Sequence, residues 1–409
     1  MNIVLEPGAA ALLDELHRAG FGAYAVGGCV RDSLLGLAPH DWDLCTAARP
    51  GQVMELFGED RCIPTGLQHG TVTVKRDGKL YEITTFRTEG RYSDGRHPDS
   101  VAFVPDLRED LARRDFTINA MAYSAEEGLC DPFGGREDLA RGVVRAVGEP
   151  LRRFGEDALR ILRLYRFAAR FGFAIDEATE AAAKQLASHL DCVSAERIEE
   201  ELNKLLAAPQ PGAYLEPEVL AFVLPELPPE ELTKARRRID ALPAGTEQVS
   251  ARWAALLLPL GETGARKALK RLKCSNVRID GAAVLVRECG EKTPDASDRC
   301  DLRLQAKRLL GKYDLHTVQQ LTALWTALAP EEKASFDALR AEAEALTAQG
   351  VCCRISQLAV NGRDLMAAGA APGPGLRRVL EALLEEVITG RLPNEKTELL
   401  AFAAGFSAS

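Results

Sequence analysis

The spacing of apolar residues changes near residue 147, and this change limits the folds that are open to the chain. Before it, short runs rich in Val and Thr alternate with Gly and Asp, which is typical of strands joined by turns. From Gly155 onward, Leu and Ala recur at three- and four-residue intervals, a spacing that predicts helices. We therefore expect an α+β part up to about residue 147 and an all-α remainder.

The segment 27–43 begins with a pattern found at phosphate-binding turns. Residues 23–26 are typical of a short apolar strand, and residues 29–35 of a short helix that ends before Gly36. Gly27 and Gly28 lie between them. Glycines let the backbone approach a polyphosphate closely, and the free N–H groups at a helix start attract anions. We predict that this turn binds phosphate groups.

Asp41 and Asp43 follow directly and form a candidate metal site. If a strand begins at Asp41, its two-residue period places both carboxylates on one face and Trp42 and Leu44 on the other. Mg²⁺ prefers oxygen ligands and commonly binds through one or two carboxylates together with substrate phosphates. A lone Asp-x-Asp can also be a solvated loop, but the neighbouring glycine turn favours the metal site.

A β-hairpin is predicted between residues 71 and 86, because two strand-like runs flank Asp77-Gly78, a dipeptide typical of tight hairpin turns. Glu82 lies on the second of these strands. It is a candidate third carboxylate for the metal site, and the alternative is an exposed strand residue without that role.

A polar string interrupts an otherwise apolar, helix-like run at residues 113–122. Polar groups that enter a protein core need partners. Arg114 and Asp115 can pair with each other, but Asn119 follows Asp115 by four residues and would share a polar edge with it. An edge of this kind can read the hydroxyl groups of a ribose.

A further candidate site begins at Glu156. On a helix, Glu156 and Asp157 would lie four and three residues before Arg160, so both can form structural ion pairs with it. The functional alternative is that an Asp acceptor beside an Arg donor addresses the Watson–Crick edge of a nucleobase. Asp157 and Arg160 would then accept cytosine and adenine, whose amino group adjoins a ring acceptor, and reject uracil and guanine.

Charge and targeting signals narrow the functional classes. A net charge of −9 and a pI near 5.4 argue against nonspecific nucleic-acid binding, but six arginines between residues 151 and 170 leave a local basic stripe that can hold RNA. The apolar runs are far shorter than the ~18 residues that cross a bilayer, and the N-terminus lacks a basic signal start, so we expect no membrane association and a cytoplasmic location. Ten cysteines without a Cys-x-x-Cys pair indicate reduced thiols.

Several motifs, taken in order, resemble those of the class II tRNA nucleotidyltransferases, the bacterial-type CCA-adding enzyme family. They are Gly27-Gly28-x-Val30-Arg31-Asp32, Asp41-x-Asp43, Arg114-Asp115-x-x-x-Asn119, Asp131-x-x-Gly134-Gly135 and Glu156-Asp157-x-x-Arg160. Asn361-Gly362-x-Asp364-Leu365 and the segment 390–394 resemble the family's tail more loosely. The resemblance implies a polymerase-β-like nucleotidyltransferase head with a five-stranded sheet at 1–147, then a helical neck at 148–208, a helical body at 209–330 and a tRNA-binding helical tail at 331–409.

The resemblance also implies an activity, namely addition of C, C and A from CTP and ATP to the 3′ end of tRNA with release of pyrophosphate. Asp41 and Asp43 would hold two Mg²⁺ ions. Gly27, Gly28 and Arg31 would face the triphosphate, and Arg114, Asp115 and Asn119 would lie near the ribose. Glu156, Asp157 and Arg160 would select the base. Arg163 would hold the base or the triphosphate. The implied partners are CTP, ATP and the 3′ end, acceptor arm and T-loop region of tRNA, and no obligate protein partner is indicated.

Members of the family differ in the nucleotides they add. CC-adding members lack a flexible loop that is intact here at residues 87–98, although His97 stands where many relatives carry an arginine. The intact loop favours full CCA addition or A-only addition to tRNA-CC, and the A-adding specialist is the first alternative. A non-catalytic RNA-binding relative is the second, and the presence of both Asp41 and Asp43 argues against it. The segment 66–71 lacks the Gly-Arg-Arg-Phe-like signature of bacterial poly(A) polymerases, which argues against poly(A) synthesis.

Overall fold

The computed structural model describes residues 3–90, 101–290 and 302–406, which divide into two compact units. Unit 1 comprises Met1–Pro229 and Arg271–Lys273, and unit 2 comprises Glu230–Lys270 and Cys274–Ser409. The division after Pro229 falls inside the segment 209–330, which the sequence assigns to one helical body. The four-part division into head, neck, body and tail stays a prediction.

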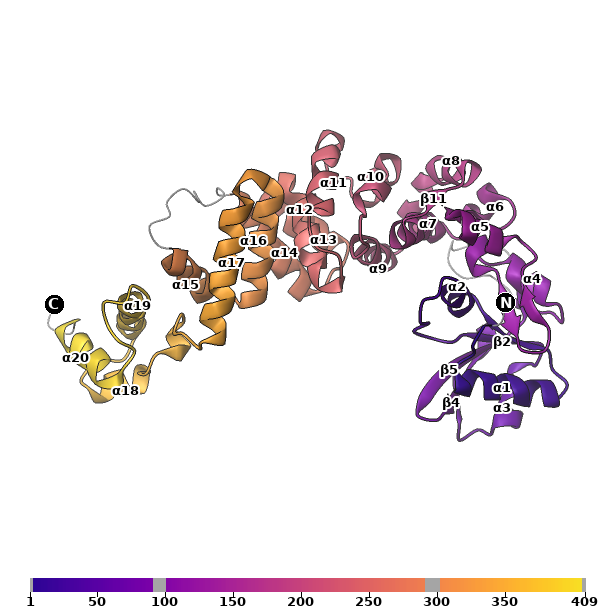
Figure 1. Cartoon of the computed structure of the whole chain (residues 1–409), viewed down its shortest axis with the longest axis horizontal. Coiled ribbons are helices and arrows are strands. Elements are labelled where there is room, and N and C mark those ends of the chain that lie inside the picture. The colour runs from indigo at the N-terminus through magenta and orange to yellow at the C-terminus, as the bar shows by residue number, and fades with distance from the viewer. Residues whose placement is uncertain (1–2, 91–100, 291–301, 407–409) are drawn as a thin grey trace. The chain divides into compact units, whose positions relative to one another are not determined.

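Unit 1 contains strands and helices that alternate along the chain, and Figure 1 labels several of them. Its strands are β1 (Ala23–Val26), β2 (Leu44–Thr46), β3 (Cys62–Gly66), β4 (Thr71–Arg76), β5 (Lys79–Thr85), β6 (Arg87–Glu89), β7 (Val101–Phe103), β8 (Ala122–Ser124), β9 (Gly128–Cys130), β10 (Val143–Val144) and β11 (Ala174–Ile175). Its helices are α1 (Pro7–Arg18), α2 (Gly28–Leu34), α3 (Pro50–Phe57), α4 (Leu107–Ala112), α5 (Gly135–Arg141), α6 (Pro150–Glu156), α7 (Leu159–Phe171), α8 (Glu177–Gln185), α9 (Ala195–Leu206) and α10 (Pro217–Val223).

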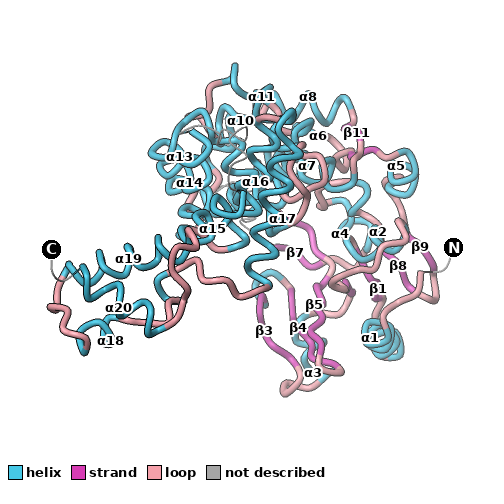
Figure 2. Tube along the Cα trace, turned by 60° about the vertical axis from the view of Figure 1, so that its left-hand side comes forward, coloured by secondary structure: helices cyan, strands magenta, loops and turns pink. Residues whose placement is uncertain are grey.

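The main sheet of unit 1 has seven strands in the order β3-β4-β5-β2-β1-β8-β9. The family resemblance implied a five-stranded sheet, and this number is wrong, because the described sheet has seven strands. β2 and β5 pair in parallel, and the other neighbours in the sheet pair antiparallel. Figure 2 shows these strands in the part of unit 1 that precedes α6, and α1 and α3 pack against the sheet.

The predicted hairpin is confirmed. β4 and β5 pair antiparallel, with Thr73 opposite Glu82. Asp77 and Gly78 have φ angles of 50° and 76°, and two successive positive φ angles define the turn type that matches the twist of a hairpin. Glu82 is exposed on β5, as one of the two predictions for it requires.

The predicted strand, glycine turn and helix around Gly27 are also confirmed. β1 ends at Val26 and α2 begins at Gly28, so Gly27 is the residue at the turn, with a φ of +78°. A Cβ atom at Gly27 would lie 2.9 Å from Nη1 of Arg114, so a larger residue there meets both backbone strain and a steric conflict.

The acid pair precedes its strand instead of beginning it. The ladder with β1 covers residues 44–46, so β2 starts at Leu44 and not at Asp41. The predicted alternation still holds, because Asp41 and Asp43 are exposed whereas Trp42 and Leu44 are buried. Both carboxylates therefore lie on the solvent-accessible side of the chain.

Residues 113–122 do not form the expected helix-like run. Residues 117–119 form a single 3-10 turn, and the apolar residues after it enter the sheet as β8. The Asp115 carboxylate accepts a hydrogen bond from the N–H of Phe116 at 2.8 Å. A local bond of this kind gives the backbone a partner outside a helix, which explains why the prediction was wrong.

The helix expected across residues 156–160 is broken at Asp157. α6 ends at Glu156, Asp157 has the extended angles φ −144° and ψ 105°, and α7 begins at Leu159. The Asp157 carboxylate accepts from the N–H of Leu159 at 3.1 Å, and its carbonyl accepts from the N–H of Arg160 at 3.0 Å. Asp157 therefore lies at the break between α6 and α7, bonds the first residues of α7, and does not lie on a continuous helix with Arg160.

Unit 2 is helical throughout its described residues, as predicted. Its helices are α11 (Leu232–Asp240), α12 (Val249–Leu257), α13 (Gly261–Arg271), α14 (Asn276–Gly290), α15 (Leu302–Lys312), α16 (Leu315–Leu328), α17 (Lys333–Ala348), α18 (Gly362–Ala367), α19 (Pro374–Ile388) and α20 (Lys396–Phe406). Trp253, Trp325 and Phe336 are fully or almost fully buried and belong to its core.

The tail-like motif in unit 2 has a local structural function. Asn361 caps α18 by accepting from the N–H of Arg363 at 2.8 Å, and the Asp364 carboxylate accepts from the N–H of Asn361 at 2.9 Å. This reciprocal pattern is a capping box, which satisfies N–H groups at a helix start. Asn394 connects the segment 390–394 to the residues just before Asn361. Its side chain hydrogen-bonds the backbone of Gln357 and Ala359.

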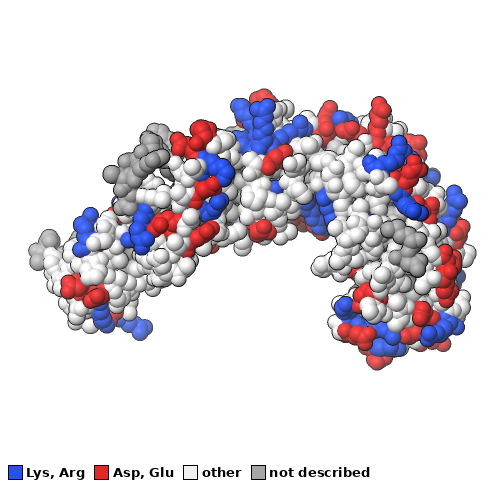
Figure 3. Space-filling view, in the orientation of Figure 1, with Lys and Arg blue, Asp and Glu red and all other residues white. Residues whose placement is uncertain are grey.

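The visible surface carries interleaved positive and negative side chains, with one group of Lys and Arg over α11 (Figure 3). This pattern agrees with an acidic chain that has local basic regions. Within the described ranges, every helix falls short of the length and apolarity that a membrane crossing requires.

Candidate functional site

Most of the predicted site residues gather around one pocket of about 630 Å³ in unit 1. Arginine is its most frequent lining residue, and four aspartates also line it. The lining consists of Gly27, Gly28, Arg31, Asp41, Asp43, Arg113, Arg114, Asp115, Asn119, Asp157, Leu159, Arg160, Arg163, Arg166, Phe167, Arg170, Arg197 and Lys204. Of the predicted residues, Glu82 and Glu156 lie outside this lining.

Asp41 and Asp43 are exposed to the pocket just before β2. Loss of water around Asp43 raises the pKa of its carboxyl, the negative charge of Glu82 raises it further, and Arg114 counteracts both. Glu82 is therefore close enough to act electrostatically on Asp43. The described residues hold no group of three or more His, Cys, Asp or Glu side chains that could hold a metal ion on their own.

Asp115 is the buried centre of the predicted ribose-reading string. Its carboxylate accepts from Nε of Arg163 at 2.9 Å and from Nδ2 of Asn119 at 3.0 Å. Burial would raise the pKa of Asp115, but the Arg163 charge and the Asn119 hydrogen bond outweigh it and hold the pKa well below its usual range. The ion pair between Asp115 and Arg163 thus connects the polar string to α7. Arg114 does not pair with Asp115 as one alternative predicted, because it pairs with Asp110 at 3.3 Å.

Arg31 borders the pocket but is only 3% exposed. Its guanidinium donates to Asp32 at 2.8 Å and to Oδ1 of Asn119, and it lies over the rings of Phe167 and Phe171 at 5.2 and 4.9 Å. Cation–π contacts of this kind are strongest where water is excluded. Arg31 therefore joins α2 to α7, and its predicted contact with a triphosphate stays a prediction.

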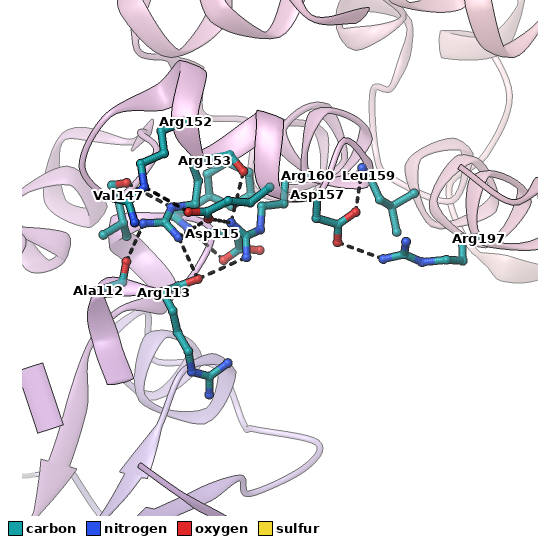
Figure 4. A network of polar contacts seen from close by, with 12 residues as sticks. Ala112, Arg113, Asp115, Val147, Arg152, Arg153, Asp157, Leu159, Arg160 and Arg197 are labelled. Atoms are coloured by element: carbon teal, nitrogen blue, oxygen red, sulfur yellow. Dashed lines mark hydrogen bonds and ion pairs between the residues drawn. The ribbon is translucent and has the colours of Figure 1, made fainter. Parts of the chain in front are cut away.

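Glu156 and Arg160 form the ion pair that the sequence predicted as one alternative. Oε2 of Glu156 accepts from Nη1 of Arg160 at 3.0 Å and from Nη1 of Arg153 at 2.6 Å. Arg160 also donates from Nη1 to the carbonyl of Arg153 at 3.1 Å and from Nη2 to the carbonyl of Arg113 at 3.2 Å (Figure 4). These contacts fix the plane of the Arg160 guanidinium at the edge of the pocket.

Asp157 pairs with a residue that the sequence did not single out. Its Oδ2 atom lies 2.9 Å from Nη2 of Arg197 on α9, as Figure 4 shows. The predicted ion pair between Asp157 and Arg160 is therefore wrong, because Asp157 pairs with Arg197, whereas the predicted pair between Glu156 and Arg160 is present. Asp157 and Arg160 still line the same pocket, so the pair can face one ligand.

Five basic lining residues were not predicted as site residues: Arg113, Arg166, Arg170, Arg197 and Lys204. Arg166 and Arg170 were predicted only as part of the basic stripe at residues 151–170. The arginines of α7 recur every three or four residues from Arg160 to Arg170, and this helical spacing was the available signal. Arg197 and Lys204 lie on α9, and only the packing of α7 against α9 brings them to the site.

Three protein families match consecutive parts of the chain. Residues 23–145 match the family described as Poly A polymerase head domain, and residues 172–228 match the RNA and SrmB- binding site of polymerase A. Residues 245–403 match tRNA nucleotidyltransferase domain 2. The α6–α7 junction with Asp157 and Arg160 falls between the first two of these matches.

Individual proteins match over almost the full chain. The CCA-adding enzyme of Limosilactobacillus fermentum is 38% identical over 408 residues, which cover 96% of this chain and 95% of the relative. The CCA-adding enzyme of Latilactobacillus sakei is 39% identical over 402 residues, with 96% of each protein covered.

Solved structures of such proteins have the same fold. The structure of the Bacillus stearothermophilus CCA-adding enzyme in complex with CTP has a TM-score of 0.82 and 33% identity, and covers 99% of this chain and 98% of that one. The Thermotoga maritima CCA-adding enzyme complexed with tRNA has a TM-score of 0.70 at 22% identity, with 98% and 96% covered.

Proposed function

Because the chain belongs to the CCA-adding enzyme family of tRNA nucleotidyltransferases, we propose that it adds C, C and A from CTP and ATP to the 3′ end of tRNA without a nucleic-acid template. One observation carries the proposal. A single pocket is lined by the acid pair Asp41 and Asp43 and by the donor and acceptor pair Arg160 and Asp157. The proposed site for phosphoryl chemistry and the proposed site for reading a base would therefore share one cavity.

The reaction transfers a nucleotidyl group. The 3′ hydroxyl of the tRNA attacks the α-phosphorus of the nucleoside triphosphate, a new phosphodiester forms, and the bond to pyrophosphate breaks. Mg²⁺ bound to Asp41 and Asp43 would neutralise the charge on the phosphates and help to activate the hydroxyl. The residues fit Mg²⁺, because two exposed carboxylates leave room for the waters and phosphate oxygens that complete its shell.

The remaining groups of this chain position the nucleotide. We assign the triphosphate to the Gly27-Gly28 turn and to the pocket arginines, Arg31 and Arg163 included, and the ribose to Arg114, Asp115 and Asn119. The basic lining supports this assignment, because guanidinium groups bind phosphate oxygens in a bidentate manner. Glu82 raises the pKa of Asp43 through its negative charge, but within the described residues it does not complete a three-carboxylate metal group with Asp41 and Asp43, so the metal is assigned to the acid pair alone.

Base choice is assigned to Asp157 and Arg160, with Glu156 as the residue that orients Arg160. Cytosine and adenine place an amino donor next to a ring acceptor, which complements an aspartate acceptor beside an arginine donor. Uracil and guanine present the opposite order, so the pair would face unmatched groups at a cost of about 1–3 kcal/mol for each. The pocket therefore would serve as the template.

A single assay distinguishes full CCA addition from A-only addition. Purified protein is incubated with Mg²⁺, with labelled CTP or ATP, and with tRNA transcripts that end at the discriminator base or at CC. Full CCA addition predicts CTP incorporation into the first transcript and ATP incorporation into the second, whereas an A-adding specialist labels only the CC transcript. Absence of incorporation at every salt concentration would support a non-catalytic RNA-binding relative. Most of the loop at residues 87–98, on which the distinction partly rests, lies outside the described residues.

We also propose a cytoplasmic location. Cys29, Cys45, Cys352 and Cys353 are buried thiols outside any disulfide. Buried thiols of this kind are typical of a protein in a reducing compartment.

A further inference from the structure

Arg153 is a buried arginine at the α6–α7 junction that bonds three separate segments of unit 1. It is 8% exposed. Its Nε atom donates to the carbonyl of Val147 at 3.3 Å, and Nη2 donates to the carbonyl of Ala112 at 2.7 Å. Its Nη1 atom donates to the carbonyl of Arg113 at 3.2 Å and to Glu156 at 2.6 Å. The guanidinium thus connects the end of α4, the residues after β10 and the end of α6.

Arg153 and Arg160 share two acceptors. Both guanidinium groups donate to the carbonyl of Arg113, as Figure 4 shows. Both also donate to Oε2 of Glu156. Arg113 directly precedes Arg114 and Asp115, which we assign to the ribose. The two shared acceptors therefore set the distance between the ribose-reading segment and the base-reading guanidinium of Arg160.

We propose that Arg153 is a positioning residue for nucleotide selection, which holds Arg160 in register with the segment 114–119. The inference rests on the proposed function of the pocket. Arg153 is absent from the lining of the pocket, so it acts on the nucleotide through Arg160 and the Arg113 carbonyl. A site held in this way selects a base by a fixed geometry, because small displacements of a reading group weaken its hydrogen bonds.

The chemistry of the contacts requires arginine. Donation from Nε, Nη1 and Nη2 in three directions uses the planar fork of a guanidinium, whereas a lysine ammonium is a compact charge on a flexible stem. A lysine at position 153 can keep the ion pair with Glu156 but cannot reach the three carbonyls at once. The Arg153→Lys variant therefore separates charge from geometry.

The neighbouring residue supplies a matched control. The Nε atom of Arg152 also pairs with Glu156, at 3.2 Å, but 77% of its side chain is exposed. Exposed pairs of this kind contribute little to stability. Arg152→Met removes one positive charge beside Glu156 and leaves the carbonyl contacts of Arg153 in place.

The test compares kcat and KM for CTP and UTP on a tRNA transcript ending at the discriminator base, in wild-type protein and in Arg153→Lys, Arg153→Met and Arg152→Met, together with thermal unfolding. We expect Arg153→Lys to fold with a lowered Tm, because buried carbonyls lose their donor, and to lose roughly tenfold in the preference for CTP over UTP. Arg153→Met should lose both stability and preference, and Arg152→Met should keep both.

The outcomes separate this inference from the proposed function. Wild-type protein that incorporates no nucleotide would reject the proposed function itself. An active wild type whose CTP preference is unchanged in Arg153→Lys would overturn the inference alone, and so would an equal loss of preference in Arg152→Met, because the charge of Glu156 would then be the cause.

Discussion

Oδ2 of Asp157 lies 2.9 Å from Nη2 of Arg197, so a residue of α9 fixes the carboxylate that we assign to base reading. The other oxygen of Asp157 accepts from the N–H of Leu159. Both oxygens of the carboxylate thus have partners in the protein, which limits the orientations in which it can accept a bond from a base.

Replacement of Arg197 by Met should loosen Asp157 and lower base selectivity. We expect the preference for CTP over UTP to fall roughly tenfold, because one charge-assisted hydrogen bond no longer orients the acceptor. Steady-state incorporation with each triphosphate measures the effect. Arg141→Met is a suitable control, since Arg141 forms a comparable but exposed ion pair with Glu137 on α5. Equal selectivity in wild type and Arg197→Met would reject the orienting role.

Asp41→Ala and Asp43→Ala should each abolish nucleotide addition and leave the fold intact. Both side chains are exposed, and their removal opens no cavity in the core. Nucleotide incorporation, tRNA binding by gel shift and thermal unfolding are measured together. Asp14→Ala on α1, where Asp14 pairs only loosely with Arg18 at 3.6 Å, serves as the control. Loss of folding in the two variants would show that the acid pair has a structural role instead.

The sequence predicted those parts of the site that local signals specify. The Gly27 turn and the Asp77-Gly78 hairpin were predicted correctly, because positive φ angles favour particular residues at particular positions. The breaks at Asp115 and Asp157 were missed, since in both an aspartate side chain bonds a nearby backbone N–H and competes with a helix. Arg197 could not be found locally, because its contact depends on the packing of α9 against α7.

The ionised state of Asp115 should make the stability of unit 1 depend on pH. Burial favours the neutral acid, but Arg163 and Asn119 lower the pKa of Asp115 below its usual range. A carboxyl with a lowered folded pKa stabilises the fold above its unfolded pKa of about 4, and this contribution is lost as the pH falls through the folded pKa.

Asp115→Asn is therefore expected to reduce the free energy of unfolding by about 1–3 kcal/mol at neutral pH. The difference from wild type should shrink as the pH falls below about 4. Denaturant unfolding across this range measures it. A difference that stays constant with pH would indicate that the carboxyl is not ionised in the folded protein.

Gly27→Ala should impair nucleotide binding. A side chain there meets a φ of +78° and would lie 2.9 Å from Nη1 of Arg114, so Arg114 must move. We expect a higher KM for CTP and ATP and a stability loss of about 1 kcal/mol. Gly20→Ala has a similar positive φ without a close contact and is the matched control. If both variants raise KM equally, the displacement of Arg114 is not the cause.

We propose that a pocket of the protein, and not a nucleic-acid template, selects the sequence CCA. The most direct measurement supplies all four nucleoside triphosphates at equal concentration with Mg²⁺ and a tRNA transcript that ends at the discriminator base, and then sequences the 3′ ends of the products. We expect the added sequence to be CCA and addition to stop there. Products that carry U or G, or extended runs of A, would contradict this proposal.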